Sequence, residues 1–60
     1  MDAVYQLTTD ERARIEEIQD SLIGRYVALR EAHHENQNVR AREIEAEINE
    51  LRREIEEIKG

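Results

Sequence analysis

A chain of 60 residues holds one domain at most, and so small a domain is usually stabilised by a disulfide, a metal or a second chain. Cysteine is absent, which excludes disulfides and thiolate zinc sites, so oligomerisation is the expected means of stabilisation. The formal net charge of −6 argues against nucleic acid and against an anionic membrane surface as partners, and we expect neither.

The composition also favours one fold class. Proline is absent and the two glycines stand at 24 and 60, which is typical of long helices and unlike a turn-rich β fold. No apolar run approaches the roughly 20 residues that span a bilayer, and the N-terminus has no secretory signal pattern. We therefore expect an all-α, soluble, cytoplasmic protein.

The chain begins with a short segment, residues 1–7, that is too short to form a sheet despite the β-prone Val4, Tyr5 and Leu7. We expect it to be an N-terminal arm. Thr8 is followed three places later by Glu11, the spacing of a capping box, in which each side chain accepts a hydrogen bond from the other residue's amide. A first helix is predicted over about 8–34.

Apolar residues along this first helix form two stripes. Ile23 and Val27 lie about 100° around the helix from the main stripe, which suggests that this helix has two neighbours and not one. The main stripe contains Ile15, Ile18, Leu22, Tyr26 and Leu29.

Residues 33–38 interrupt the apolar pattern, and their asparagines suit the left-handed backbone of a helix C-terminus or the N-cap of a new helix. We predict a turn at about 34–37 and a second helix at about 38–59. Apolar residues recur in the second helix at alternating spacings of four and three, the pattern of a coiled-coil seam. They are Ala41, Ile44, Ile48, Leu51, Ile55 and Ile58.

The two apolar patterns mirror each other when the chain folds back near residue 35. Leu22 then lies opposite Ile48 and Tyr26 opposite Ile44, and the charged pairs Arg25 with Glu45 and Glu11 with Lys59 face each other. This symmetry predicts a single domain over 8–60, a two-helix antiparallel hairpin. Ile23 and Val27 remain uncovered, which predicts self-association, with a homodimer forming a four-helix bundle.

One continuous helix is the alternative, because no proline or glycine enforces the reversal. The same heptads would then form a parallel coiled coil, with attractive flanking pairs such as Arg40 with Glu45 and Glu54 with Lys59. The predicted oligomer or partner interface consists of Ile15, Ile18, Leu22, Ile23, Tyr26, Val27, Leu29, Ile44, Ile48, Leu51, Ile55 and Ile58.

Candidate chemistry is sparse, and we predict no enzyme activity, no catalytic residue and no cofactor. Ser21 is the only serine and has no base near it in the sequence, and no glycine-rich phosphate loop is present. Glu31 and His34 have the i, i+3 spacing with which ferritin-like bundles bind two metal ions. They are the candidates for a metal site, with a metal-dependent oxidase as the corresponding enzyme.

The predicted function is therefore assembly or protein–protein interaction by a small acidic, self-associating helical protein that pairs with itself or with a helical partner. One alternative is a di-metal-binding helical bundle. Another is an acidic inhibitor that binds a basic surface or channel of a larger enzyme. The candidate contacts of such an inhibitor lie off the seams: Asp20, Glu31, Glu35, Glu43, Glu50 and Glu57.

Overall fold

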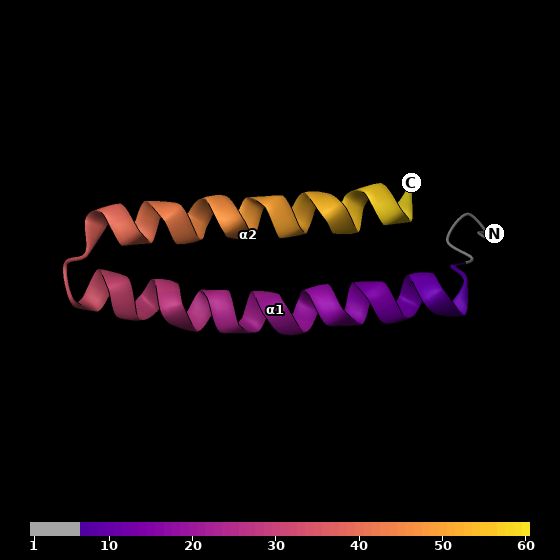
Figure 1. Ribbon diagram of the computed structural model, residues 1–60, viewed down its shortest axis with the longest axis horizontal. Coiled ribbons are helices and arrows are strands. Elements are labelled where there is room, and N and C mark those ends of the chain that lie inside the picture. The colour runs from indigo at the N-terminus through magenta and orange to yellow at the C-terminus, as the bar shows by residue number, and fades with distance from the viewer. Residues whose placement is uncertain (1–6) are drawn as a thin grey trace.

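The computed structural model describes residues 7–60, so the predicted arm residues Val4 and Tyr5 lie outside the described residues. Two helices, α1 (Thr9–His34) and α2 (Asn38–Lys59), run antiparallel and pack side by side over their length (Figure 1). The described part of the chain contains no strand. The predicted all-α hairpin is confirmed, and the single continuous helix is wrong.

The start of α1 is the predicted capping box. The Glu11 amide donates to Thr8 Oγ1 at 3.0 Å, and the Thr8 amide donates to Glu11 Oε1 at 2.9 Å. Two amides at the helix start that have no partner inside the helix are thus satisfied. The predicted contact between Glu11 and Lys59 is wrong, because the Glu11 carboxylate folds back onto its own helix.

Asn36 makes the reversal between the helices. Its φ of 60° is left-handed, a conformation that asparagine tolerates better than most residues. The Gln37 amide donates to the Ala32 carbonyl at 2.8 Å and the Asn36 amide to the His33 carbonyl at 3.1 Å, the two bonds of a Schellman motif. Gln37 is the N-cap of α2 and makes no side-chain capping bond. The turn thus depends on backbone geometry at one residue.

A single apolar seam holds the helices together. The side chains of Ile18 and Ile44 are each only 1% exposed, and the half-buried Leu51, Ile55 and Ile58 extend the seam toward the open end of the hairpin. Neither helix is long and apolar enough to cross a membrane. The buried residues are Ile15, Ile18, Leu22 and Ala32 of α1 and Ala41, Ile44 and Ile48 of α2.

The inner face of α1 differs from the prediction at two positions. Tyr26 keeps 46% of its surface exposed and borders the seam, whereas Ala32, which was not predicted, is 3% exposed. The difference arises because the buried residues continue the four and three spacing through Arg25 and Leu29 to Ala32. That path places Tyr26 on the flank of the helix.

Charged side chains at one flank of the seam join the helices. Arg14 Nη2 lies 3.0 Å from Glu54 Oε1, and Arg25 Nε lies 2.9 Å from Glu47 Oε1. The predicted pair of Arg25 with Glu45 is wrong by about half a helical turn, since Glu45 instead lies 3.9 Å from His33. All of these side chains are about half exposed, so each pair adds at most about 1 kcal/mol of stability.

Candidate interaction surface

The predicted interface residues divide into three groups in the structure. Only Ile23, Tyr26 and Val27 remain about half exposed or more, so they are the predicted contacts still available to another molecule. Leu29, Leu51, Ile55 and Ile58 are half-buried against the seam. Burial between the two helices of one hairpin already accounts for Ile15, Ile18, Leu22, Ile44 and Ile48.

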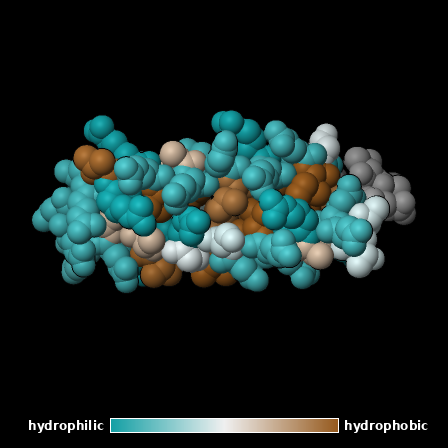
Figure 2. All heavy atoms as spheres, viewed as in Figure 1, coloured by the Kyte–Doolittle hydropathy of each residue, from teal (hydrophilic) through white to brown (hydrophobic). Residues whose placement is uncertain are grey.

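The exposed apolar residues lie mostly on the outside of α1. Ile23 is 63% exposed and Val27 53% exposed, and their spacing of four places them one turn apart on one side of the helix. This side faces away from α2, because both residues lie more than about 120° around the helix from the buried Ile18. Figure 2 shows apolar side chains emerging along this outer edge of α1, among otherwise polar atoms.

Val39 of α2 is a fourth exposed large apolar residue, at 72% exposure. It stands in the first turn of α2, beside the reversal, and so at a distance along the hairpin from Ile23. The outer side of α2 carries no apolar pair comparable to Ile23 and Val27 within the described residues. The two helices therefore differ in their outer faces, and α1 carries the apolar one.

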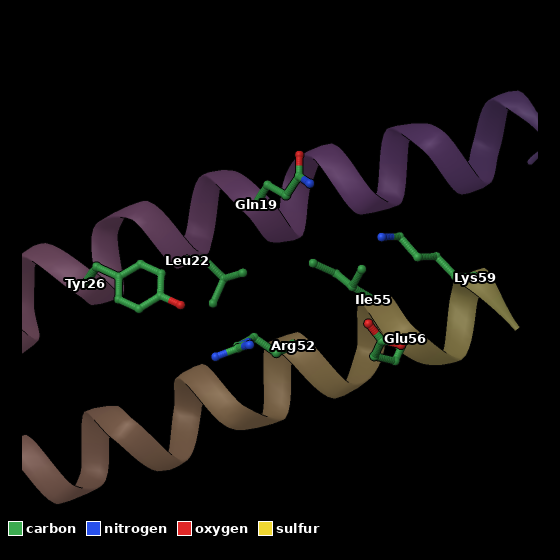
Figure 3. A pocket seen from close by; sticks show the side chains of 7 residues that line it. All are labelled: Gln19, Leu22, Tyr26, Arg52, Ile55, Glu56 and Lys59. Atoms are coloured by element: carbon green, nitrogen blue, oxygen red, sulfur yellow. The ribbon is translucent and has the colours of Figure 1, made fainter. Parts of the chain in front are cut away.

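A shallow groove of about 350 Å³ lies between the helices on the Tyr26 flank. Leu22 and Ile55 point toward each other across it, and Tyr26 lies along the α1 wall (Figure 3). The rim is polar and charged and consists of Gln19 from α1 and Arg52, Glu56 and Lys59 from α2. The apolar surface of Tyr26 thus adjoins the outer pair Ile23 and Val27 on one side and this groove on the other.

The opposite flank is already occupied by interhelical ion pairs. Arg14 and Arg25 of α1 reach across it to Glu54 and Glu47 of α2. A partner approaching there would meet charged groups that are already paired. The Tyr26 flank and the outer side of α1 are therefore the more accessible surfaces for an apolar contact.

The candidate metal ligands lie close together at the end of α1. Glu31 and His34 are both exposed and one turn apart, and His33 points toward Glu45 of α2 at 3.9 Å. Within residues 7–60, no three histidine, aspartate or glutamate side chains come together in a group that could hold a metal ion. The hairpin thus brings no further described ligand to the predicted pair.

The six acidic candidates for binding a basic partner are all exposed, and they are spread over both helices and the turn. Glu43, Glu50 and Glu57 share one side of α2, because they are spaced by seven residues, and the other three candidates belong to α1 and its C-cap. The sequence patterns did not predict the burial of Ala32 or the contacts of Arg14 with Glu54, Arg25 with Glu47 and His33 with Glu45. The spacing of three between Leu29 and Ala32 was the available signal for the alanine.

Comparisons of the chain with models of protein families, with curated proteins and with solved structures find no match. The surface of the hairpin itself is therefore the basis for assigning a function.

Proposed function

We propose that this chain is an assembly module whose hairpin pairs with a second copy of itself, giving a homodimer of four helices. The observation that carries the proposal is the exposure of Ile23 and Val27 on the outer side of α1. The seam of one hairpin covers only one side of each helix. A second copy would cover the apolar side of α1 that α2 leaves exposed.

The size of the core also supports pairing. Seven apolar side chains are buried and two of these are alanines, which is a small core for the 54 described residues. Chains below about 70 residues commonly need an additional source of stability, and association supplies it by burying further apolar surface. The half-buried Leu51 and Ile55 show that the seam itself is not fully covered.

The test compares two variants that add the same negative charge to an exposed valine. Val27→Glu places a carboxylate inside the proposed interface. Val39→Glu places the same group in the first turn of α2, where a negative charge interacts favourably with the helix dipole. Sedimentation equilibrium should find dimers for the unmodified chain and for Val39→Glu, and monomers for Val27→Glu at the same concentration. Circular dichroism checks that all three remain helical.

An unmodified chain that stays monomeric up to high micromolar concentration would overturn the proposal. Equal association of Val27→Glu and the unmodified chain would also overturn it, because the outer side of α1 would then play no part.

The acidic inhibitor is the second candidate function. The exposure of Asp20, Glu31, Glu35 and the other acidic candidates supports it, together with the net charge of −6. Complementary charge would accelerate binding to a basic protein surface and make that binding sensitive to salt. The test titrates a basic model protein, such as lysozyme, with the chain at low and at physiological salt. Binding that is lost on adding salt supports the inhibitor function, and an absence of binding at low salt contradicts it.

A further inference from the structure

The exposed side of α1 carries a second heptad stripe, independent of the seam. Its six members are spaced alternately by four and three, and on an ideal helix they fall within an arc of about 80° on the side away from α2. All six are exposed: Glu16, Asp20, Ile23, Val27, Arg30 and His34. This outer stripe is chemically ordered, with two acids, then two apolar residues, then two basic residues.

Because of this order, the stripe is complementary to the same stripe of a second copy that runs in the opposite direction. When a second α1 lies antiparallel with position 25 opposite position 25, Ile23 meets Val27 of the second copy. Asp20 then meets Arg30 and Glu16 meets His34 of the second copy, and two-fold symmetry forms each pair twice. From this charge complementarity we infer that two hairpins pair through α1 against α1, antiparallel, centred on position 25. The inference rests on the self-association proposed above and specifies its geometry.

The single hairpin leaves the charges of the stripe unpaired within its described part. Arg14 and Arg25 bind glutamates of α2, but Glu16, Asp20 and Arg30 form no ion pair among residues 7–60. Glu16 and Asp20 stand four residues apart, a spacing at which like charges repel and weaken a helix. An antiparallel second copy would bring a basic group to each of them.

The parallel arrangement has the opposite electrostatics. Asp20 would meet Asp20 of the second copy and Arg30 would meet Arg30, so both ends of the stripe would repel. The antiparallel arrangement has one unfavourable flanking pair, Glu17 with Glu31 of the second copy, but Arg14 already lies 3.5 Å from Glu17. The balance of charges thus favours the antiparallel pairing.

Gly24 is consistent with a close approach at the centre of this interface. A methyl group added there would meet no atom within 4 Å, so the packing of a single hairpin does not require glycine. On an ideal helix the residue lies beside Val27 and next to the proposed two-fold axis. A glycine at that position allows two helix backbones to approach closely.

Charge reversal tests the register. Asp20→Arg places an arginine opposite Arg30 of the second copy, and Arg30→Asp places an aspartate opposite Asp20. Each single reversal should raise the dimer dissociation constant about tenfold, because two symmetric pairs become repulsive. The double variant Asp20→Arg/Arg30→Asp restores both pairs and should return to within about twofold of the unmodified chain.

Glu50→Arg and Arg53→Asp are the matched controls. They change the net charge by the same amounts at exposed positions of α2, outside the stripe, and should leave the dissociation constant nearly unchanged. A second measurement mixes the two single α1 variants. Native mass spectrometry should show more than twice as much mixed dimer as either homodimer, since random pairing in equal amounts already gives about a twofold excess and opposite charges meet only in the mixed species.

The results of these experiments distinguish a failure of the antiparallel register from a failure of self-association. A dimer that Val27→Glu abolishes but that the single reversals leave unchanged would overturn the antiparallel register and leave self-association standing. Single reversals that weaken the dimer without recovery in the double variant would likewise overturn the register. A monomeric unmodified chain would overturn both.

Discussion

Arg25 lies with its guanidinium nitrogen 2.9 Å from the carboxylate of Glu47, at a position of α1 where the heptad pattern of the seam calls for an apolar side chain. Ile18 and Leu22 precede it in the seam and Leu29 follows it. The arginine can occupy this position because its side chain extends to the flank and stays 45% exposed. The seam of α1 is therefore interrupted midway by an ion pair.

Replacing this arginine should stabilise the hairpin. We expect Arg25→Leu to raise the free energy of unfolding by about 1 kcal/mol, because a half-exposed ion pair contributes little and a leucine would continue the apolar seam. Urea denaturation at fixed protein concentration measures the change. Arg12→Leu, at an exposed position outside the seam, is the control and should give no gain. A loss of more than 1 kcal/mol in Arg25→Leu would show that the ion pair matters more than the packing.

The most buried isoleucine of α1 should be far more important for folding than the most exposed one. Ile18→Ala is expected to lower the free energy of unfolding by about 3 kcal/mol, since the residue is 1% exposed and its loss leaves a cavity. Ile23→Ala should cost less than about 1 kcal/mol in the dissociated hairpin, because that side chain is 63% exposed. Denaturation at low micromolar concentration compares the two. Similar losses would contradict the assignment of the seam.

Asn36 should be sensitive to any side chain that disfavours left-handed backbone. Asn36→Ala is expected to lower the free energy of unfolding by about 1 kcal/mol, while Asn36→Gly should leave it unchanged or raise it. Thermal unfolding followed by circular dichroism gives both values. Asn38→Ala, two residues later and inside α2, serves as the control. If alanine and glycine behaved alike at position 36, the Schellman reversal would not be present in solution.

Replacing Gly24 should have opposite effects on the stability of the hairpin and on the affinity of the dimer. Gly24→Ala is expected to stabilise the dissociated hairpin by about 1 kcal/mol, because alanine favours the helix and its methyl group meets nothing there. The same methyl group should weaken the proposed dimer by holding the two α1 helices apart. Denaturation at low concentration and sedimentation at high concentration separate the two effects. A destabilised hairpin would contradict the open environment of Gly24.

The two helices differ in how well their sequence patterns predict packing. In α2, apolar residues occur almost only at seam positions, so the predicted stripe from Ala41 to Ile58 is buried or half-buried throughout. In α1, Arg25 occupies a seam position and the apolar Tyr26 stands next to it in the sequence. The apolar pattern therefore wrongly assigned Tyr26 to the seam. Ala32 was missed because a single alanine is a weak hydrophobic signal. The ion pair of Arg25 also differs from the prediction, because a long side chain can reach a partner half a helical turn away in either direction.

The outer surface could be predicted only in part. The spacing of Ile23 and Val27 placed them away from the main stripe, and both are exposed in the hairpin. Exposure of two apolar side chains does not by itself specify the molecule that covers them. From the order of charges around them we propose a second copy as the occupant, and this order becomes evident once the seam of α1 is known.

The sequence of charges along α1 also follows the polarity of the helix backbone. Asp10 and Glu11 occupy the first turn and His33 and His34 the last, and the outer stripe has the same direction, from acid to base. A helix dipole favours this order, with anions near its positive end and cations near its negative end. Any helix charged in this way is attracted to a copy of itself that runs in the opposite direction. The same few charged residues can therefore both stabilise a single helix and favour its pairing with a second copy. Neither effect would need to be selected separately.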